Sequence, residues 1–159
     1  MVSRRSAGLL LYRNAPTGIE VLLAHPGGPL WARRDDGAWT VPKGEYGPDE
    51  EPLAAARREF AEEMGRPAPA APGLVDLGEV RQRSGKIVTA WALEGDFDTS
   101  GLVSNTFEME WPPHSGRRCS FPEIDRAQWF PLPTARAKMV PAQAEFLDRL
   151  VAALEADGS

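Results

Sequence analysis

The chain has 159 residues, which is the size of one ordinary domain, and we expect a single domain over residues 1–159. Its content of 42% hydrophobic and 26% charged residues is typical of a globular protein and argues against a disordered chain. The formal net charge of −5 argues against general binding to nucleic acid or to an anionic membrane surface, because both need a basic face.

The N-terminal segment resembles a signal peptide only superficially. Arg4 and Arg5 precede an apolar run that ends at Arg13, which is too short, and no small-residue cleavage site follows. No segment approaches the roughly 20 apolar residues of a membrane span. Cys119 is the only cysteine, so an intrachain disulfide is excluded and we expect a cytoplasmic protein.

In the first half of the chain, apolar runs at 7–13 and 18–25 flank the segment NAPTG, which predicts a β-hairpin. A loop rich in Gly, Pro and Trp follows, and a short strand is expected at residues 40–42. Pro52 then suits the first turn of a helix, and Gly65 followed by Pro67 predicts its end.

The Pro/Ala-rich segment at 66–73 predicts an irregular connector after this helix. Four strands are expected in the second half of the chain, at 74–82, 86–94, 105–111 and 127–131. The segment between the last two, 112–123, is predicted to be a loop, and Pro141 opens a final amphipathic helix. Strands in hairpins, with one helix among them and one at the end, predict an α/β (α+β) fold with helices packed on a mixed β-sheet.

The helix at 52–64 concentrates carboxylates near its C-terminal end. At 100° per residue, Glu59, Glu62 and Glu63 fall within an arc of about 100°, apart from the apolar stripe of the helix. Like charges repel at this spacing, and the helix dipole disfavours anions at the C-terminal end. The arc contains no Lys, so a solvated acidic face and a divalent-cation site are about equally well supported by these residues alone.

The same segment resembles the Nudix hydrolase signature, which is Gly, five residues, Glu, seven residues, then Arg-Glu-hydrophobic-any-Glu-Glu-any-Gly-hydrophobic. The chain has Gly44, Glu50 and then Arg58-Glu59-Phe60-Ala61-Glu62-Glu63-Met64-Gly65, and it departs from the signature only at Arg66. The flanking segments GAWTVPKGE and FPEIDRAQWFPL also resemble the family. The resemblance implies a Nudix-type α/β/α sandwich and hydrolysis of a nucleoside diphosphate linked to a variable group.

Specific roles follow from this resemblance. It implies Mg²⁺ or Mn²⁺ as cofactor, held by Gly44 through its carbonyl and by Glu59, Glu62 and Glu63. It also implies a supporting pair between Arg58 and Glu50, for which an ordinary surface ion pair is the alternative. The general base is Glu62, Glu59 or an acid on a later loop; the later acids are Glu108, Glu110 and Glu123.

Substrate contacts are expected from basic and aromatic residues of the loops. Those predicted to bind substrate are Lys43, Arg33, Arg34, Trp31 and Trp111. In the later loop His114, Arg117 and Arg118 are further basic residues that can reach a phosphate. For each of these, an exposed loop residue or a core aromatic is the alternative.

The lead-in Trp39 to Gly44 resembles the dinucleoside-tetraphosphate branch, although no Tyr follows Tyr46. We therefore expect a dinucleoside polyphosphate or a nucleoside triphosphate as substrate. The resemblance also leaves a homodimer open, because many Nudix proteins are dimers. The alternatives are a catalytically silent Nudix-fold module that binds a nucleotide and an unrelated acidic interaction protein; the intact box acids argue against the first of these.

Overall fold

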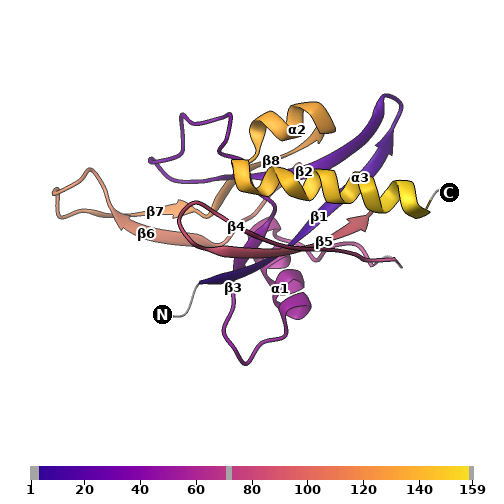
Figure 1. Ribbon diagram of the computed structural model, residues 1–159. Coiled ribbons are helices and arrows are strands. Elements are labelled where there is room, and N and C mark those ends of the chain that lie inside the picture. The colour runs from indigo at the N-terminus through magenta and orange to yellow at the C-terminus, as the bar shows by residue number, and fades with distance from the viewer. Residues whose placement is uncertain (1–3, 71–72, 158–159) are drawn as a thin grey trace.

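A mixed sheet of six strands runs through the molecule, whose computed structural model describes residues 4–70 and 73–157 (Figure 1). Its strands are β1 (Arg5–Ala15), β2 (Gly18–Pro26), β3 (Lys43–Glu45), β4 (Val75–Arg81), β5 (Ile87–Glu94) and β8 (Ile124–Pro131). The order is β4-β5-β1-β2-β8, and β3 pairs with the N-terminal part of β1. β1 runs parallel to β5, whereas its pairings with β2 and β3 are antiparallel.

Helices cover both faces of this sheet. Helix α1 (Pro52–Met64) packs on one face, and α2 (Leu132–Lys138), the 3-10 helix η1 (Pro141–Ala144) and α3 (Glu145–Asp157) pack on the other (Figure 1). The expected α/β/α sandwich with a mixed sheet is therefore confirmed. The helices within the described ranges are all too short or too polar to span a bilayer.

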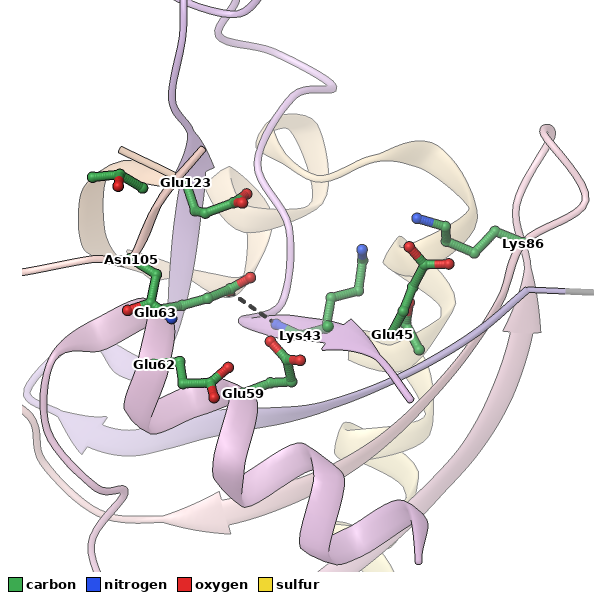
Figure 2. Close-up of a pocket in the computed structure, with 11 residues that line it drawn as sticks. Lys43, Glu45, Glu59, Glu62, Glu63, Lys86, Asn105 and Glu123 are labelled. Carbon is green, nitrogen blue, oxygen red and sulfur yellow. Dashed lines mark hydrogen bonds between the residues drawn. The ribbon is translucent and has the colours of Figure 1, made fainter. Parts of the chain in front are cut away.

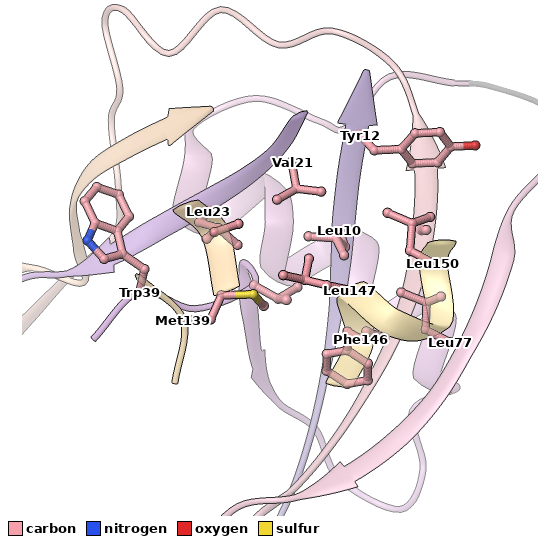
Figure 3. Close-up of a cluster of buried hydrophobic side chains, with 14 of the residues drawn as sticks. Leu10, Tyr12, Val21, Leu23, Trp39, Leu77, Met139, Phe146, Leu147 and Leu150 are labelled. Carbon is pink, nitrogen blue, oxygen red and sulfur yellow. The ribbon is translucent and has the colours of Figure 1, made fainter. Parts of the chain in front are cut away.

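Alternation along β1 divides the core into two clusters. Leu9 and Leu11 pack with Phe60 of α1, whereas Leu10 and Tyr12 point to the opposite face, toward Phe146 of α3. Figure 3 shows this second cluster, in which side chains of β1 and β2 meet the apolar stripe of α3. The two clusters hold α1 and α3 against opposite faces of the same strand, which fixes the position of the acidic helix.

Helix α1 begins and ends where its sequence predicts. Pro52 occupies the first turn, and Gly65 ends the helix in the left-handed conformation with φ 81°. The carboxylate of Glu51 accepts hydrogen bonds from the backbone N–H groups of Leu53 and Ala54, so this acid caps the helix.

Two segments differ clearly from the sequence-based expectations, and the connector after α1 agrees with them. The strand expected at 40–42 lies at 43–45, because its partner is the N-terminal part of β1, where Gly8 pairs with Lys43. The predicted loop 112–123 contains β7 (Arg118–Pro122), which pairs with β6 (Thr106–Glu110) in a projecting two-stranded sheet. The connector after α1 contains no helix where it is described, and its residues 71 and 72 lie outside the described residues.

Candidate active site

A cavity of about 430 Å³ lies beside the C-terminal half of α1 (Figure 2). This volume falls within the range of small-molecule sites, about 300–1,000 Å³. Its lining residues are Ser6, Lys43, Gly44, Glu45, Glu59, Glu62, Glu63, Lys86, Asn105, Thr106 and Glu123. The lining is almost entirely polar, and it brings the three carboxylates of the acidic helix together with residues from β1, β3, the turn before β5, and β6.

Helix packing directs these carboxylates into the cavity. Ala56, Phe60 and Met64 are fully buried against the sheet, so the rotation of α1 about its axis is fixed. Glu59 and Glu63 are one helical turn apart and therefore project from the same side of the helix, next to β3 (Figure 2). The separation of the acidic arc from the apolar stripe, predicted from the 3.6-residue period, is present in the fold.

Arg58 supplies the positive charge that the arc itself does not contain. Its guanidinium donates two hydrogen bonds of 2.8 Å to the carboxylate of Glu50, and further bonds of 2.9 and 3.1 Å to Glu59 and Glu62. The bond from Arg58 lowers the pKa of Glu50 below its usual value. The predicted Arg58–Glu50 pair is therefore present, and it ties the loop before α1 to the helix.

Gly44 leaves room for the carboxylate of Glu59. A Cβ atom on Gly44 would lie 1.9 Å from the carboxyl carbon of Glu59 and 2.0 Å from one of its oxygens. These distances are far inside van der Waals contact. The glycine at this position of β3 is thus a steric requirement of the adjacent acid.

Glu63 is more deeply buried than Glu59 within the cavity. Its carboxylate accepts a hydrogen bond of 3.2 Å from the backbone N–H of Lys43, which links α1 to β3. Burial raises the pKa of Glu63 to about 8, and burial also raises the pKa of Glu59. Burial lowers the pKa of the Lys43 ammonium, so the cavity disfavours isolated charge of either sign.

The raised pKa of Glu63 predicts a pH-dependent stability of the metal-free protein. Between the ordinary value of 4.5 and about 8, the folded protein retains a proton that the unfolded chain has released, so the stabilisation present below pH 4.5 is lost as the pH rises through 8. We expect the melting temperature in EDTA to fall further between pH 5 and pH 8 in the wild type than in Glu63→Gln. Scanning calorimetry measures this difference, and parallel curves for the two proteins would contradict it.

The donor set fits a hard divalent cation, although the side chains do not form a finished coordination shell. Within residues 4–70 and 73–157, no three His, Cys, Asp or Glu side chains are grouped as a metal site. Glu59 and Glu62 are instead held by Arg58. Clustered carboxylate oxygens are nevertheless the ligands that Mg²⁺ and Mn²⁺ prefer, and Glu59, Glu62 and Glu63 all line the cavity.

A second cavity of about 280 Å³ adjoins the first, and Glu123 lines both. It is mainly apolar, with Leu30 and Trp31 on one side and Phe107 and Met109 of β6 on the other. The loop that carries Trp31 is anchored by buried His25, whose ring nitrogens bond to Asp125 at 2.7 Å and to the backbone carbonyl of Arg34 at 2.6 Å.

The other residues predicted to bind substrate lie outside both cavities. Arg33 is exposed, the guanidinium of Arg34 lies 5.2 Å from the ring of Trp31, and Trp111 lies at the end of β6. Of the three later acids, Glu123 lines these two cavities and the other two line neither; Glu108 pairs with Arg118 instead. The substrate roles of Arg33, Arg34 and Trp111 stay predictions.

Several residues that line the main cavity could not be predicted from the sequence. These are Ser6, Glu45, Lys86, Asn105 and Thr106. No local signal distinguishes them, since they belong to an edge strand, a turn and strand ends that only the sheet topology brings together. Lys86 directly follows the predicted Ser-Gly turn, and this position is the one local signal that could have drawn attention to it.

Comparison with known families gives one extensive match. The sequence model described as "NUDIX domain" matches residues 2–150 of the chain. This range includes β1, the acidic helix, both cavities and the first part of α3. No curated protein matches the chain at a significant level.

Solved structures with the same fold include three Nudix-related proteins. An Ap4A hydrolase binary complex from C. elegans shares 24% identity over 96% of this chain and 98% of its own, with a TM-score of 0.63. The Nudix hydrolase RenU from M. smegmatis shares 24% identity over 98% of this chain and 89% of its own, with a TM-score of 0.62. The NUDIX domain of NrtR from Shewanella oneidensis, solved with ADP ribose, shares 12% identity over 97% of this chain and 90% of its own, with a TM-score of 0.62. At these identities the likeness shows a common fold.

Proposed function

Because this chain belongs to the Nudix family and is a pyrophosphohydrolase of that family, we propose that it hydrolyses the pyrophosphate linkage of a nucleoside diphosphate-X compound with a divalent cation. The observation that carries this proposal is the cavity in which the three carboxylates of α1 meet Gly44. If the acidic face of α1 had no chemical role, its carboxylates would not need to line a cavity. Nor would residue 44 need to be a glycine to leave room for Glu59.

The residues proposed to hold Mg²⁺ or Mn²⁺ are Glu59, Glu62, Glu63 and the carbonyl of Gly44. When bound, such an ion offsets the negative charge of the phosphates and polarises the phosphorus that water attacks. Arg58 keeps Glu59 and Glu62 apart and oriented, and Glu50 holds Arg58 in place. These are positioning roles, because neither Arg58 nor Glu50 lines the cavity.

Glu62 is proposed to take the proton from the attacking water. Its side chain is 40% exposed, against 15% for Glu59, so a water molecule can reach it from solvent. Glu63 is more enclosed and is already bonded to the backbone of Lys43. Glu123 is the remaining acid within the cavity, and it stands at the boundary with the second cavity.

The second cavity is proposed to hold the nucleobase. Its apolar walls and aromatic rings suit a flat heterocycle, and a base bound there would lie next to the acidic cavity that is proposed to receive the phosphates, since Glu123 lines both. The similarity to the C. elegans Ap4A hydrolase and the lead-in to the box support a dinucleoside polyphosphate or a nucleoside triphosphate as substrate. The cytoplasm remains the expected compartment, on the ground of the single cysteine.

A hydrolysis panel tests the proposed function. The purified chain is incubated with Mg²⁺ or Mn²⁺ and with nucleoside triphosphates, dinucleoside polyphosphates, ADP-ribose, nucleotide sugars and dinucleotide coenzymes. We expect turnover of at least one compound, with products that locate the cleavage at a phosphoanhydride bond. Tight binding of a nucleotide without turnover of any compound would overturn the proposal and favour a catalytically silent binding module.

Replacing Trp31 by Ala tests the proposed base site. We expect KM for the preferred nucleotide to rise ~5- to 10-fold with little change in kcat, because an aromatic contact to the base is lost. Steady-state kinetics measure this split. Trp111→Ala is the comparison variant, because Trp111 is the other Trp predicted to bind substrate but lines neither cavity, and equal effects of the two substitutions would contradict the assignment of the base to the second cavity.

A further inference from the structure

A buried glutamine links the acidic cavity to the opposite face of the sheet. Gln143, in the 3-10 helix η1, is completely buried, and its Oε1 accepts a hydrogen bond of 2.9 Å from the backbone N–H of Val41. Its Nε2 donates bonds of 2.9 Å to Oγ1 of Thr40 and to Oε1 of Gln82. A backbone N–H can only donate, so the bond from Val41 shows which end of the amide is the oxygen. One side chain therefore joins η1 to the segment before β3 and to the turn between β4 and β5.

Two side chains from opposite faces of the sheet hold the segment that leads into β3. The N–H of Val41 donates to Gln143, which lies on the face covered by α3. The N–H of Lys43 donates at 3.2 Å to the carboxylate of Glu63, which belongs to α1 on the other face. Pro42, between them, has no N–H and a fixed φ, so it offers neither another bond nor much freedom. A displacement of Val41 is therefore passed on to Lys43 and changes its distance from Glu63.

The position of β3 matters because the acids of α1 are packed closely against it. A Cβ atom on Gly44 would lie 1.9 Å from the carboxyl carbon of Glu59, so the strand and this acid are already in contact. Glu63 is bonded to the residue before Gly44. A small shift of the strand would therefore move two of the three carboxylates that line the cavity. The amide of Gln143 also supports a second part of the cavity wall, because its partner Gln82 donates from its backbone N–H to the carbonyl of Lys86, at 2.8 Å.

We propose that Gln143 is a positioning residue of the acidic cavity: it holds β3 in place against α1, so that Glu59 and Glu63 keep the arrangement in which they bind a divalent cation. This inference rests on the proposed function and adds to it a residue that lies far outside the Nudix box. Without the amide oxygen, the N–H of Val41 would be buried without a partner, and the cost of that state favours a displaced segment. The N–H of Lys43 then leaves the carboxylate of Glu63.

Amide hydrogen exchange in EDTA, followed by NMR, tests this coupling without metal or turnover. We expect Gln143→Met to speed the exchange of the Val41 N–H, and also that of the Lys43 N–H, ~5- to 10-fold, because both bonds depend on one position of the segment. Gln143→Glu retains an oxygen that can accept the bond from Val41, so we expect it to restore slow exchange at both amides. Faster exchange at Val41 with an unchanged rate at Lys43 would overturn the proposal, since Gln143 would then act only locally.

Calorimetric titration with Mg²⁺ tests the consequence for the acids. We expect Gln143→Met to weaken Mg²⁺ binding ~10-fold, because residues that orient the ligands of a metal affect its affinity. Arg149→Met is the matched control, because Arg149 also makes long-range hydrogen bonds, to the carbonyls of Leu77 and Glu79. These bonds do not involve β3, so we expect a lower melting temperature but an Mg²⁺ affinity within about twofold of the wild type. An unchanged affinity in Gln143→Met, or equal losses in the two variants, would overturn the proposal.

Exchange in the wild type keeps the proposal testable if Gln143→Met does not fold. If the bond between Val41 and Gln143 strengthens Mg²⁺ binding, linkage requires that Mg²⁺ in turn stabilises this bond. We therefore expect added Mg²⁺ to slow the exchange of the Val41 N–H as well as that of Lys43, and slowing at Lys43 alone would overturn the proposal. A chain that shows the expected exchange rates in EDTA but binds no Mg²⁺ would disprove the proposed function, while leaving the positioning of Lys43 by Gln143 standing.

Discussion

Replacing Glu63 by Gln is expected to lower kcat of the Mg²⁺-dependent reaction by ~10³-fold, or about 4 kcal/mol of transition-state stabilisation, while the fold is retained. Glu63 is the enclosed acid of the cavity, and a neutral amide in its place removes one of the charges proposed to hold the cation. The amide oxygen can still accept the hydrogen bond from the backbone of Lys43, so the link between α1 and β3 survives.

Steady-state kinetics at saturating Mg²⁺, together with a melting curve, measure both parts of this expectation. Glu110→Gln makes the same chemical change on an exposed position of β6, outside both cavities, and is expected to leave kcat unchanged. Near-wild-type turnover of Glu63→Gln would remove Glu63 from the proposed metal ligands. A matching loss in Glu110→Gln would show that the effect is general and unrelated to the cavity.

Replacing Gly44 by Ala is expected to lower the affinity for Mg²⁺ ~10- to 100-fold, with a comparable loss of activity at limiting Mg²⁺. The added methyl group would overlap the carboxyl group of Glu59, at 1.9 Å from its carbon, so the acid must leave its present position. Gly44 does not have a positive φ, so the backbone itself accepts alanine. The substitution therefore tests the contact between β3 and Glu59 and not the flexibility of the chain.

Gly47→Ala is the matched control for this experiment. Gly47 lies three residues further along, in the connection between β3 and α1, has no positive φ, and a Cβ atom there would meet no atom within 4 Å. Titrating activity with Mg²⁺ in the two variants measures the difference. Equal Mg²⁺ dependence in Gly44→Ala and Gly47→Ala would contradict the role of Gly44 in shaping the acidic end.

The acidic helix could be predicted in detail because its signals are local. Pro52 and Gly65 act within one turn of each helix end, and the burial of Phe60 and Met64 follows from the 3.6-residue period alone. The capping role of Glu51 was missed, because an acid before a helix has the same local pattern whether its carboxylate bonds to the backbone or points to solvent.

The strands that were misplaced depend on partners far away in the sequence. The apolar segment TVP predicts a strand at 40–42, but pairing with β1 places it at Lys43–Glu45. Strand β7 lies in a segment rich in Pro, Gly and Arg, and its half-exposed residues become a strand only because Phe121 and Cys119 pair with β6. In both cases long-range pairing overrides the local propensity.

The residues of the candidate site also fall into two groups, those with local signals in the sequence and those brought together by distant parts of the chain. The carboxylates of α1 and their glycine form a contiguous motif, so the sequence alone could identify them. Ser6, Lys86 and Thr106 come from β1, the turn before β5, and β6, and only the tertiary fold brings them into one cavity. The position of Lys86 directly after the predicted Ser-Gly turn marks it as a turn residue, but it does not show that Lys86 faces a cavity whereas Arg83 is exposed.

The dependence of turnover on Mg²⁺ tests the central claim most directly. Hydrolysis of the best compound in the panel is followed in the wild type while free Mg²⁺ is removed with EDTA and then restored. We predict that turnover is lost on chelation, returns in full when Mg²⁺ is added back, and saturates as Mg²⁺ rises. Hydrolysis that continues unchanged in EDTA would contradict the claim that the acids of α1 act by holding a divalent cation.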